Sequence, residues 1–317
     1  MGLELNLKGK IKLRCRSTEG RGGFAIGTGR CGTKFLYSVI AREPGISSVH
    51  ERNPLNEAFH RYCKWYQLPV DDEGFLHTME LNICQDLNNH HFSFEASAHL
   101  SLSVRELYSR FGAKFILLVR SPERVVNSYL HKGWYDTPII YTNSKLALGY
   151  QQSKGFQHFL GRIVPMGEFF LQWDKMSRVG KLAWYWNTIN ALVLEQFEGI
   201  PKTNWRIEKL EELSYDRYLE ITQFLGFQAT VKRQTYNKIK YKRPNVQYNV
   251  PTIASWNMSE IIEFEREVSS MAEKLGYEYR VNRLPIPEPI KPPSDQLSTK
   301  KLSIKRLVGK ILHRMNR

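Results

Sequence analysis

A glycine-rich stretch near the start of the chain has the composition of a loop that binds a phosphate. Residues 27–35 read Gly-Thr-Gly-Arg-Cys-Gly-Thr-Lys-Phe and lie between a short apolar run at residues 24–26 and a helical pattern. The first backbone N–H groups of a helix lack partners within the helix, and the helix dipole favours negative charge there. We therefore expect this loop to bind an anion, in the first place a phosphate group.

The order of residues in this loop separates it from the common nucleoside-triphosphatase pattern G-x-x-x-x-G-K-[ST]. Gly27 and Gly32 have the separation of that pattern, but Thr33 and Lys34 follow in the reverse order. The reversal moves the lysine one position along the helix, and it leaves Arg30 as the basic residue inside the turn.

A second candidate anion site follows the strongest predicted strand. Residues 114–119 form a continuous apolar run, typical of a strand buried on both faces of a parallel sheet. Arg120 comes directly after this strand, and a helix is predicted at residues 122–131, with proline in its first turn and Ser128 two turns along it. An arginine fork and a hydroxyl in these positions can converge on one phosphate.

Strand and helix patterns alternate along the chain, and this alternation predicts the fold class. Predicted strands cover residues 24–26, 46–51, 114–119 and 205–207, with a short edge strand at 3–7. Predicted helices cover residues 33–42, 104–111, 122–131, 184–197, 215–225 and 259–275. We expect an α/β fold with a central, mostly parallel sheet flanked by helices, in which ligands bind beyond the carboxyl ends of the strands.

Composition divides the chain into three parts: a basic lead-in at residues 1–21, a folded domain at 22–284, and a proline-rich spacer with a basic tail at 285–317. The tail pattern is typical either of an amphipathic helix on an anionic membrane surface or of a disordered basic segment. The chain has 46 Lys and Arg against 31 Asp and Glu, a net charge of +15. That charge favours an anionic ligand without identifying its class.

The sequence predicts a cytoplasmic protein, peripheral at the inner membrane surface if its tail binds lipid. No apolar run is long enough to span a membrane, and residues 1–21 are too basic for a secretory signal. Cys15, Cys31, Cys63 and Cys84 have neither metal-site spacing nor the density of a disulfide framework, which agrees with a reducing compartment. The histidines also lack ligand spacing, so we expect no metal.

The two anion-binding motifs together resemble those of the sulfotransferases that use 3′-phosphoadenosine 5′-phosphosulfate (PAPS), in motif style the bacterial and glycan-modifying enzymes. Residues 30–35 match that family's 5′-phosphosulfate loop [KR]-x-G-T-T-x, and residues 120–128 match its 3′-phosphate site R-[ND]-P-x-x-[RD]-x-x-S. More weakly, residues 205–210 are similar to its Y-E-D-L strand end. Residues 242–243 and Trp256 are similar to the basic loop and tryptophan that close over the nucleotide.

The resemblance covers about residues 22–280 and implies a P-loop sulfotransferase domain. The implied reaction moves a sulfuryl group from PAPS to a hydroxyl of a glycan, glycolipid or small molecule, without a metal. Arg30 occupies the family's catalytic basic position. The donor-binding residues carried over from the motifs are Arg30, Cys31, Gly32, Thr33, Lys34, Phe35, Arg120, Ser128, Lys242 and Arg243.

Activation of an acceptor hydroxyl requires a general base, for which the chain offers three candidates. Glu51 is the first choice because glycan-modifying relatives use glutamate in this region, and His50 is the second. Since neighbours on a strand point to opposite faces, we expect only one of these two to face the sulfuryl group. Relatives often carry a lysine at the end of a later strand, where this chain has Glu-Ala-Ser-Ala-His, so His99 becomes the third candidate.

Two other functions compete with this interpretation. A P-loop kinase using ATP and magnesium would carry Lys-Ser or Lys-Thr after Gly32 and an aspartate after the strong strand, where Arg120 stands. A non-enzymatic binder of nucleic acid or acidic lipid agrees with the net charge, but the sequence contains no RNP, helix-turn-helix or zinc-finger signature. We therefore expect a hydroxyl-bearing acceptor and no nucleic acid, while the oligomeric state is left open.

Overall fold

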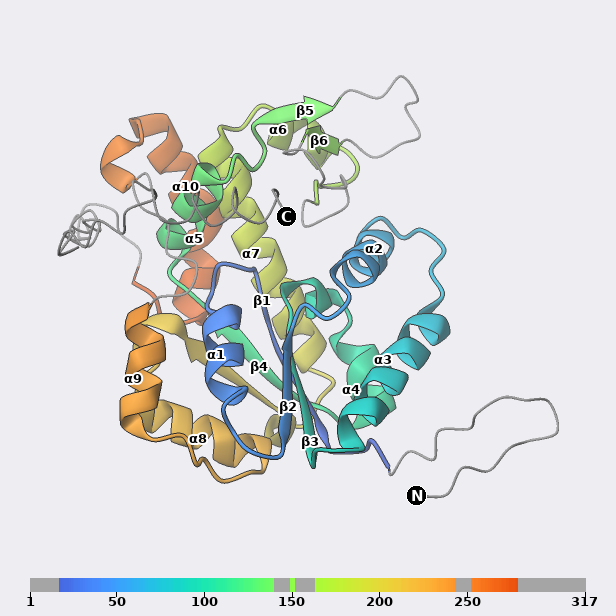
Figure 1. Ribbon diagram of the computed structural model, residues 1–317. Coiled ribbons are helices and arrows are strands. Elements are labelled where there is room, and N and C mark those ends of the chain that lie inside the picture. The colour runs from blue at the N-terminus through green and yellow to red at the C-terminus, as the bar shows by residue number, and fades with distance from the viewer. Residues whose placement is uncertain (1–16, 140–148, 152–162, 243–251, 279–317) are drawn as a thin grey trace, which may run out of the picture.

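A five-stranded sheet in the order β2-β3-β1-β4-β7 forms the centre of the molecule, and all of its strand pairs are parallel (Figure 1). The computed structural model describes residues 17–139, 149–151, 163–242 and 252–278. The strands of the sheet are β1 Gly22–Gly27, β2 Ile46–His50, β3 Phe92–Ala96, β4 Lys114–Val119 and β7 Trp205–Lys209. A separate antiparallel pair consists of β5 Thr137–Ile139 and β6 Gly149–Gln151.

Helices cover both faces of the sheet (Figure 1). Phe24 and Ile26 of β1 pack on one side with α3, α4, α5, α7 and α10, whereas Ala25 packs on the other side with α1, α8 and α9. Alternate strand residues point to opposite faces, so the central strand contributes to both hydrophobic cores. The helices are α1 Thr33–Ile40, α2 Pro54–Trp65, α3 Asp72–Leu87, α4 Val104–Phe111, α5 Pro122–His131, α6 Phe169–Asp174, α7 Arg178–Phe197, α8 Tyr215–Leu225, α9 Arg233–Lys242 and α10 Met258–Lys274.

Local sequence explains where several helices begin. Pro122 and Pro54 start α5 and α2 at positions where the missing N–H is not needed. The side chain of Asn257 accepts from the Glu260 N–H while Glu260 reaches back to Asn257, which makes a capping box for α10. Among the described residues, no side chain caps α1, which begins after Gly32.

The predicted α/β fold with a parallel sheet is confirmed. The elements at residues 104–111, 114–119, 122–131 and 215–225 have the predicted bounds, and the predicted helix at 184–197 is the second part of α7. The predictions did not include α2, α3, α6 or α9, nor the antiparallel pair β5 and β6. The described residues contain no helix long and apolar enough to cross a membrane. The predicted strand at 3–7, the domain boundaries at 21 and 284 and the basic tail lie outside or at the edge of the described residues.

The cysteines differ from the sequence-based expectation. Cys31 and Cys63 are buried free thiols, but Cys84 takes part in a disulfide bond. Cysteine usage therefore no longer supports a reducing compartment, and the cytoplasmic location stays a prediction.

Candidate active site

The glycine loop connects β1 to α1 through a backbone that mostly requires glycine. Gly27, Gly29 and Gly32 have φ angles of 154°, 80° and 104°. A Cβ at position 27 would lie 2.4 Å from the carbonyl oxygen of Leu118, and one at position 32 would lie 2.6 Å from Leu210. Glycine at these positions keeps the loop against the sheet and its backbone N–H groups near the start of α1, as in anion-binding nests.

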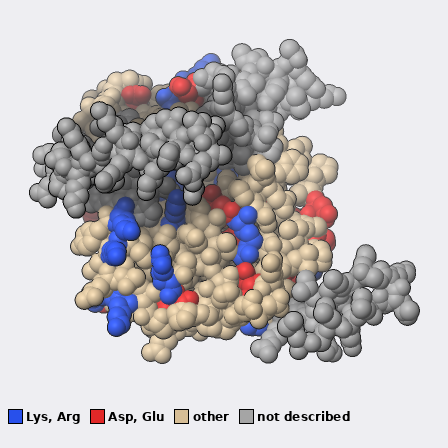
Figure 2. Space-filling model, in the orientation of Figure 1, with Lys and Arg blue, Asp and Glu red and all other residues tan. Residues whose placement is uncertain are grey.

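The loop side chains divide between solvent and core. Lys34 is exposed at the start of α1, whereas Cys31 and Phe35 are buried, and burial raises the pKa of the Cys31 thiol to about 11. Cys31 and Phe35 can therefore reach a ligand in the loop only through their backbone N–H groups. Thr33 is also buried, and its Oγ1 lies 3.2 Å from Nε2 of His50. Figure 2 shows further Lys and Arg side chains scattered over the face in front of α1 and α9.

Arg120 lies at the carboxyl end of β4, directly beside the loop. The Nη1 of Arg120 donates to the carbonyl oxygen of Arg30 at 3.1 Å. The carbonyl oxygen of Arg120 in turn accepts from the indole Nε1 of Trp186 at 3.0 Å. Burial lowers the pKa of the Arg120 guanidinium, and its buried Nε has no hydrogen-bond partner within the described part of the chain. A buried guanidinium with an N–H to spare is suited to an anionic ligand.

Helix α5 is tied to the glycine loop at two points. Nε of Arg30 donates to the buried hydroxyl of Ser128 at 2.7 Å, and the hydroxyl of Tyr129 donates to the carbonyl oxygen of Thr28 at 2.6 Å. The structure thus brings together Arg30, Arg120 and Ser128, which the sequence placed in two separate motifs.

The expected separation of His50 and Glu51 onto opposite faces is wrong. Strand β2 ends at His50, and Glu51 has a left-handed φ of 50°, so the alternation of a strand stops between them. As a result, Nδ1 of His50 lies 3.8 Å from Oε2 of Glu51.

Electrostatics distinguishes the three base candidates. Burial, and after it the charge of Glu57, raises the pKa of Glu51. Burial and Lys34 lower the pKa of His50, while burial, Arg61 and His50 lower that of His99 to about 3. At neutral pH both histidines are uncharged, and the base strength of His99 is very low. A carboxylate with a raised pKa and an uncharged imidazole can both accept a proton near neutral pH, so these shifts argue only against His99.

Arg61 of α2 is a buried charge that sequence analysis missed. It is 1% exposed, and its Nη1 donates to the carbonyl oxygen of Ala98 at 3.2 Å and to the Tyr185 hydroxyl at 3.4 Å. The Tyr185 hydroxyl in turn donates to the carbonyl oxygen of Thr28 in the glycine loop. Arg61 shares its helix face with Glu57 and His60, and polar residues at this spacing give the same pattern as a solvent-exposed face.

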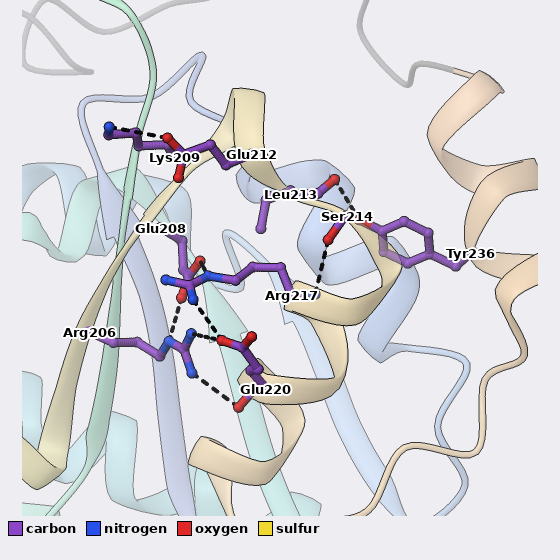
Figure 3. Close-up of polar contacts among 9 residues, drawn as sticks. All are labelled: Arg206, Glu208, Lys209, Glu212, Leu213, Ser214, Arg217, Glu220 and Tyr236. Atoms are coloured by element: carbon purple, nitrogen blue, oxygen red, sulfur yellow. Dashed lines mark hydrogen bonds and ion pairs between the residues drawn. The ribbon is translucent and has the colours of Figure 1, made fainter. Parts of the chain in front are cut away.

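The residues matched more weakly to the family have structural partners. Glu208 of β7 is buried, and Arg206 and Arg217 hold it in an ionic cluster with Glu220 (Figure 3). The indole of Trp256 is buried and donates to Oδ1 of Asn127 at 3.0 Å. Lys242 is exposed at the end of α9, and Arg243 lies outside the described residues. In the described ranges, no group of three or more His, Cys, Asp or Glu residues could hold a metal ion.

Comparisons with known proteins give the fold. No protein-family model and no curated protein matches the sequence. The sulfotransferase STF9 from Mycobacterium avium matches 83% of this chain with 78% of its own, at 11% identity and a TM-score of 0.51. The sulfotransferase domain from the curacin biosynthetic pathway matches 81% of this chain with 98% of its own, at 13% identity and a TM-score of 0.42. Mouse sulfotransferase SULT7A1, solved in complex with PAP, matches 81% of this chain with 86% of its own, at 15% identity and a TM-score of 0.43.

Proposed function

We propose that this chain, which has the fold of the sulfotransferases, transfers a sulfuryl group from PAPS to the hydroxyl of a glycan, glycolipid or small molecule. The observation that carries the proposal is the junction of the two motifs. Nη1 of Arg120 donates to the Arg30 carbonyl oxygen, and Nε of Arg30 donates to Ser128. One nucleotide with phosphates at both its 5′ and 3′ positions can bridge such adjoining sites.

The residues of the site fit the two charged ends of PAPS. Backbone N–H groups of residues 31–35, with the side chains of Thr33 and Lys34, would hold the 5′-phosphosulfate. Arg120 and Ser128 would hold the 3′-phosphate, for which the unpartnered Nε of Arg120 is the supporting observation. Lys242 and Arg243 would add positive charge beside the nucleotide.

Transfer of the sulfuryl group depends on positioning and electrostatic stabilisation, as phosphoryl transfer does. Arg30 would stabilise the charge that develops on the bridging oxygen. Because a guanidinium stays protonated, Arg30 would act through its charge and would not donate a proton. None of these steps needs a metal.

Glu51 would accept the proton of the acceptor hydroxyl. Its raised pKa and its place beside His50, which contacts Thr33 of the loop, support this role. His50 and His99 are the alternatives, and the pKa of about 3 at His99 argues against it. The acceptor class and the contact of the tail with the inner membrane surface rest on the sequence alone.

Calorimetry of the full-length protein tests the proposed donor. Adenosine 3′,5′-bisphosphate should bind tightly with and without magnesium, and ATP should bind weakly under both conditions. Tighter binding of ATP in magnesium would contradict the proposal and favour a kinase. Equally weak binding of both nucleotides would contradict it in favour of a non-enzymatic binder of anions.

A further inference from the structure

The turn after β2, which carries Glu51, is held by three consecutive backbone N–H groups. The N–H of Glu51 donates to the carbonyl oxygen of Ala96 at 3.2 Å. The N–H of Arg52 donates to Oε1 of Glu95 at 3.0 Å, and that of Asn53 donates to Oε1 of Glu57 at 2.8 Å. Two side-chain carboxyl groups, one from β3 and one from α2, thus hold the turn in its left-handed conformation at Glu51.

These two carboxyl groups are buried side by side. Glu57 is 1% exposed and Glu95 is 3% exposed, and they accept from the adjacent N–H groups of Asn53 and Arg52. Two ionised carboxylates this close in the core would repel each other, so we expect one of them to carry a proton. The hydroxyl of Ser97 donates to Oε2 of Glu57 at 2.5 Å and occupies a further acceptor position.

Arg52 is paired with Glu95, but its terminal nitrogens bind another carboxylate. The terminal nitrogens of Arg52 bind Asp86, at 3.2 and 2.5 Å. Its Nε lies 3.8 Å from Oε2 of Glu95 and has no hydrogen-bond partner among the described residues. Burial and the carboxylate of Glu57 raise the pKa of Glu95 well above its usual range.

Other charged and titratable groups face the same region from neighbouring elements. Arg61 approaches from α2, Glu51 and His50 from the end of β2, and His99 from the turn after β3. Both histidines have lowered pKa values and are neutral near pH 7. The histidines therefore contribute no positive charge beside the two carboxyl groups.

We propose that Glu57 and Glu95 share one proton at neutral pH and act as positioning residues, which fix the turn that presents Glu51 to the glycine loop. The effect on turnover rests on the proposed function, because it requires Glu51 to be the base. The shared proton and the fixed turn are properties of the folded chain itself.

Infrared spectroscopy of the full-length protein at neutral pH tests the shared proton. The parent should show a C=O stretch of a protonated carboxyl group that is lost in Glu95→Gln, because the amide replaces the protonated acid at the same size. Glu212→Gln, at an exposed carboxylate, is the matched control and should leave this band unchanged. An identical band in the parent and in Glu95→Gln would overturn the shared proton.

Hydrogen exchange tests the positioning role. Glu95→Gln keeps an acceptor for the Arg52 N–H, so residues 51–53 should stay protected, whereas Glu95→Ala should lose that protection. Equal protection in the two variants would overturn the role. If the alanine variant does not fold, the comparison between the parent and Glu95→Gln still decides the question, because exposure of the turn in Glu95→Gln would also contradict the proposal.

Turnover adds a measurement that general destabilisation would not reproduce. Displacing a catalytic group by about 1 Å can cost about 100-fold in rate, so Glu95→Ala should lower kcat by that order while the KM for PAPS stays constant.

The double variant Glu57→Gln with Glu95→Gln removes the negative charge near Glu51, so the acid limb of kcat/KM should move to lower pH. An unmoved limb would overturn the coupling to Glu51. The infrared and exchange results do not depend on sulfuryl transfer, so failure of the proposed function is recognised separately.

Discussion

The Nε of Arg30 donates a 2.7 Å hydrogen bond to the hydroxyl of Ser128 and joins the glycine loop to helix α5. This bond fixes the position of the Ser128 hydroxyl beside the loop, where we expect it to contact a phosphate group of the donor.

Ser128→Ala should weaken the binding of adenosine 3′,5′-bisphosphate by about 10-fold or more, because hydrogen bonds to charged groups contribute about 1.5–3 kcal/mol. Calorimetry measures this change. Ser269→Ala, at an exposed position on α10, is the control and should bind like the parent. Unchanged affinity in Ser128→Ala would exclude the hydroxyl from the phosphate site.

Arg120→Lys should weaken the same binding by about 10-fold to 100-fold although the charge is kept. A lysine cannot reproduce the planar fork that contacts the Arg30 carbonyl oxygen and leaves Nε for a ligand. Arg124→Lys is the control, since Arg124 is an exposed arginine in the first turn of α5, close to Arg120 in the chain. Equal affinities for the two lysine variants would remove Arg120 from the site.

Glu51→Gln should leave bisphosphate binding unchanged and lower kcat by about 10²-fold to 10⁴-fold, the usual contribution of a general base. Because the base acts when deprotonated and its pKa is raised by burial and by Glu57, kcat/KM should fall as pH falls through a value above the ordinary pKa of a glutamate. His50→Gln, measured in parallel, should retain that limb. Activity that survives in Glu51→Gln would move the role to His50 or His99.

Gly27→Ala should lower the free energy of unfolding by about 1–3 kcal/mol, the usual cost of a strained backbone conformation. The φ of 154° and the 2.4 Å approach to the carbonyl oxygen of Leu118 both oppose a side chain. Gly199→Ala, where an added Cβ meets nothing within 4 Å, should change stability by less than about 0.5 kcal/mol. Denaturant unfolding compares the two, and equal stabilities would show that the loop tolerates a side chain.

Sequence reasoning located the loop and its partner because both depend on short local patterns. Arg120 follows an apolar run whose bounds are unambiguous, and Ser128 is fixed by the helix that Pro122 begins. Parallel strands end at the same edge of the sheet, so the predicted fold class already placed Arg120 and Ser128 beside the glycine loop.

The base region was harder to predict for physical reasons. A single left-handed residue, Glu51, breaks the strand alternation, and no sequence rule gives the sign of φ at a glutamate. The buried polar face of α2 has the periodicity of a solvated one, so Glu57 and Arg61 gave no signal. The contact between Trp256 and Asn127 joins positions far apart in the chain and needs the packed structure.

The strand order predicts which step of the reaction a substitution would impair. Arg120 and Ser128 are on the β4 side of the central strand, whereas His50, Glu51 and Glu95 are on the β3 and β2 side. Lesions in one half of the molecule should impair capture of the nucleotide, and lesions in the other half should impair activation of the acceptor. A collection of random mutants should therefore contain two classes, one defective in nucleotide binding and one defective in acceptor activation. Substitutions in the loop after β1 should be defective in both.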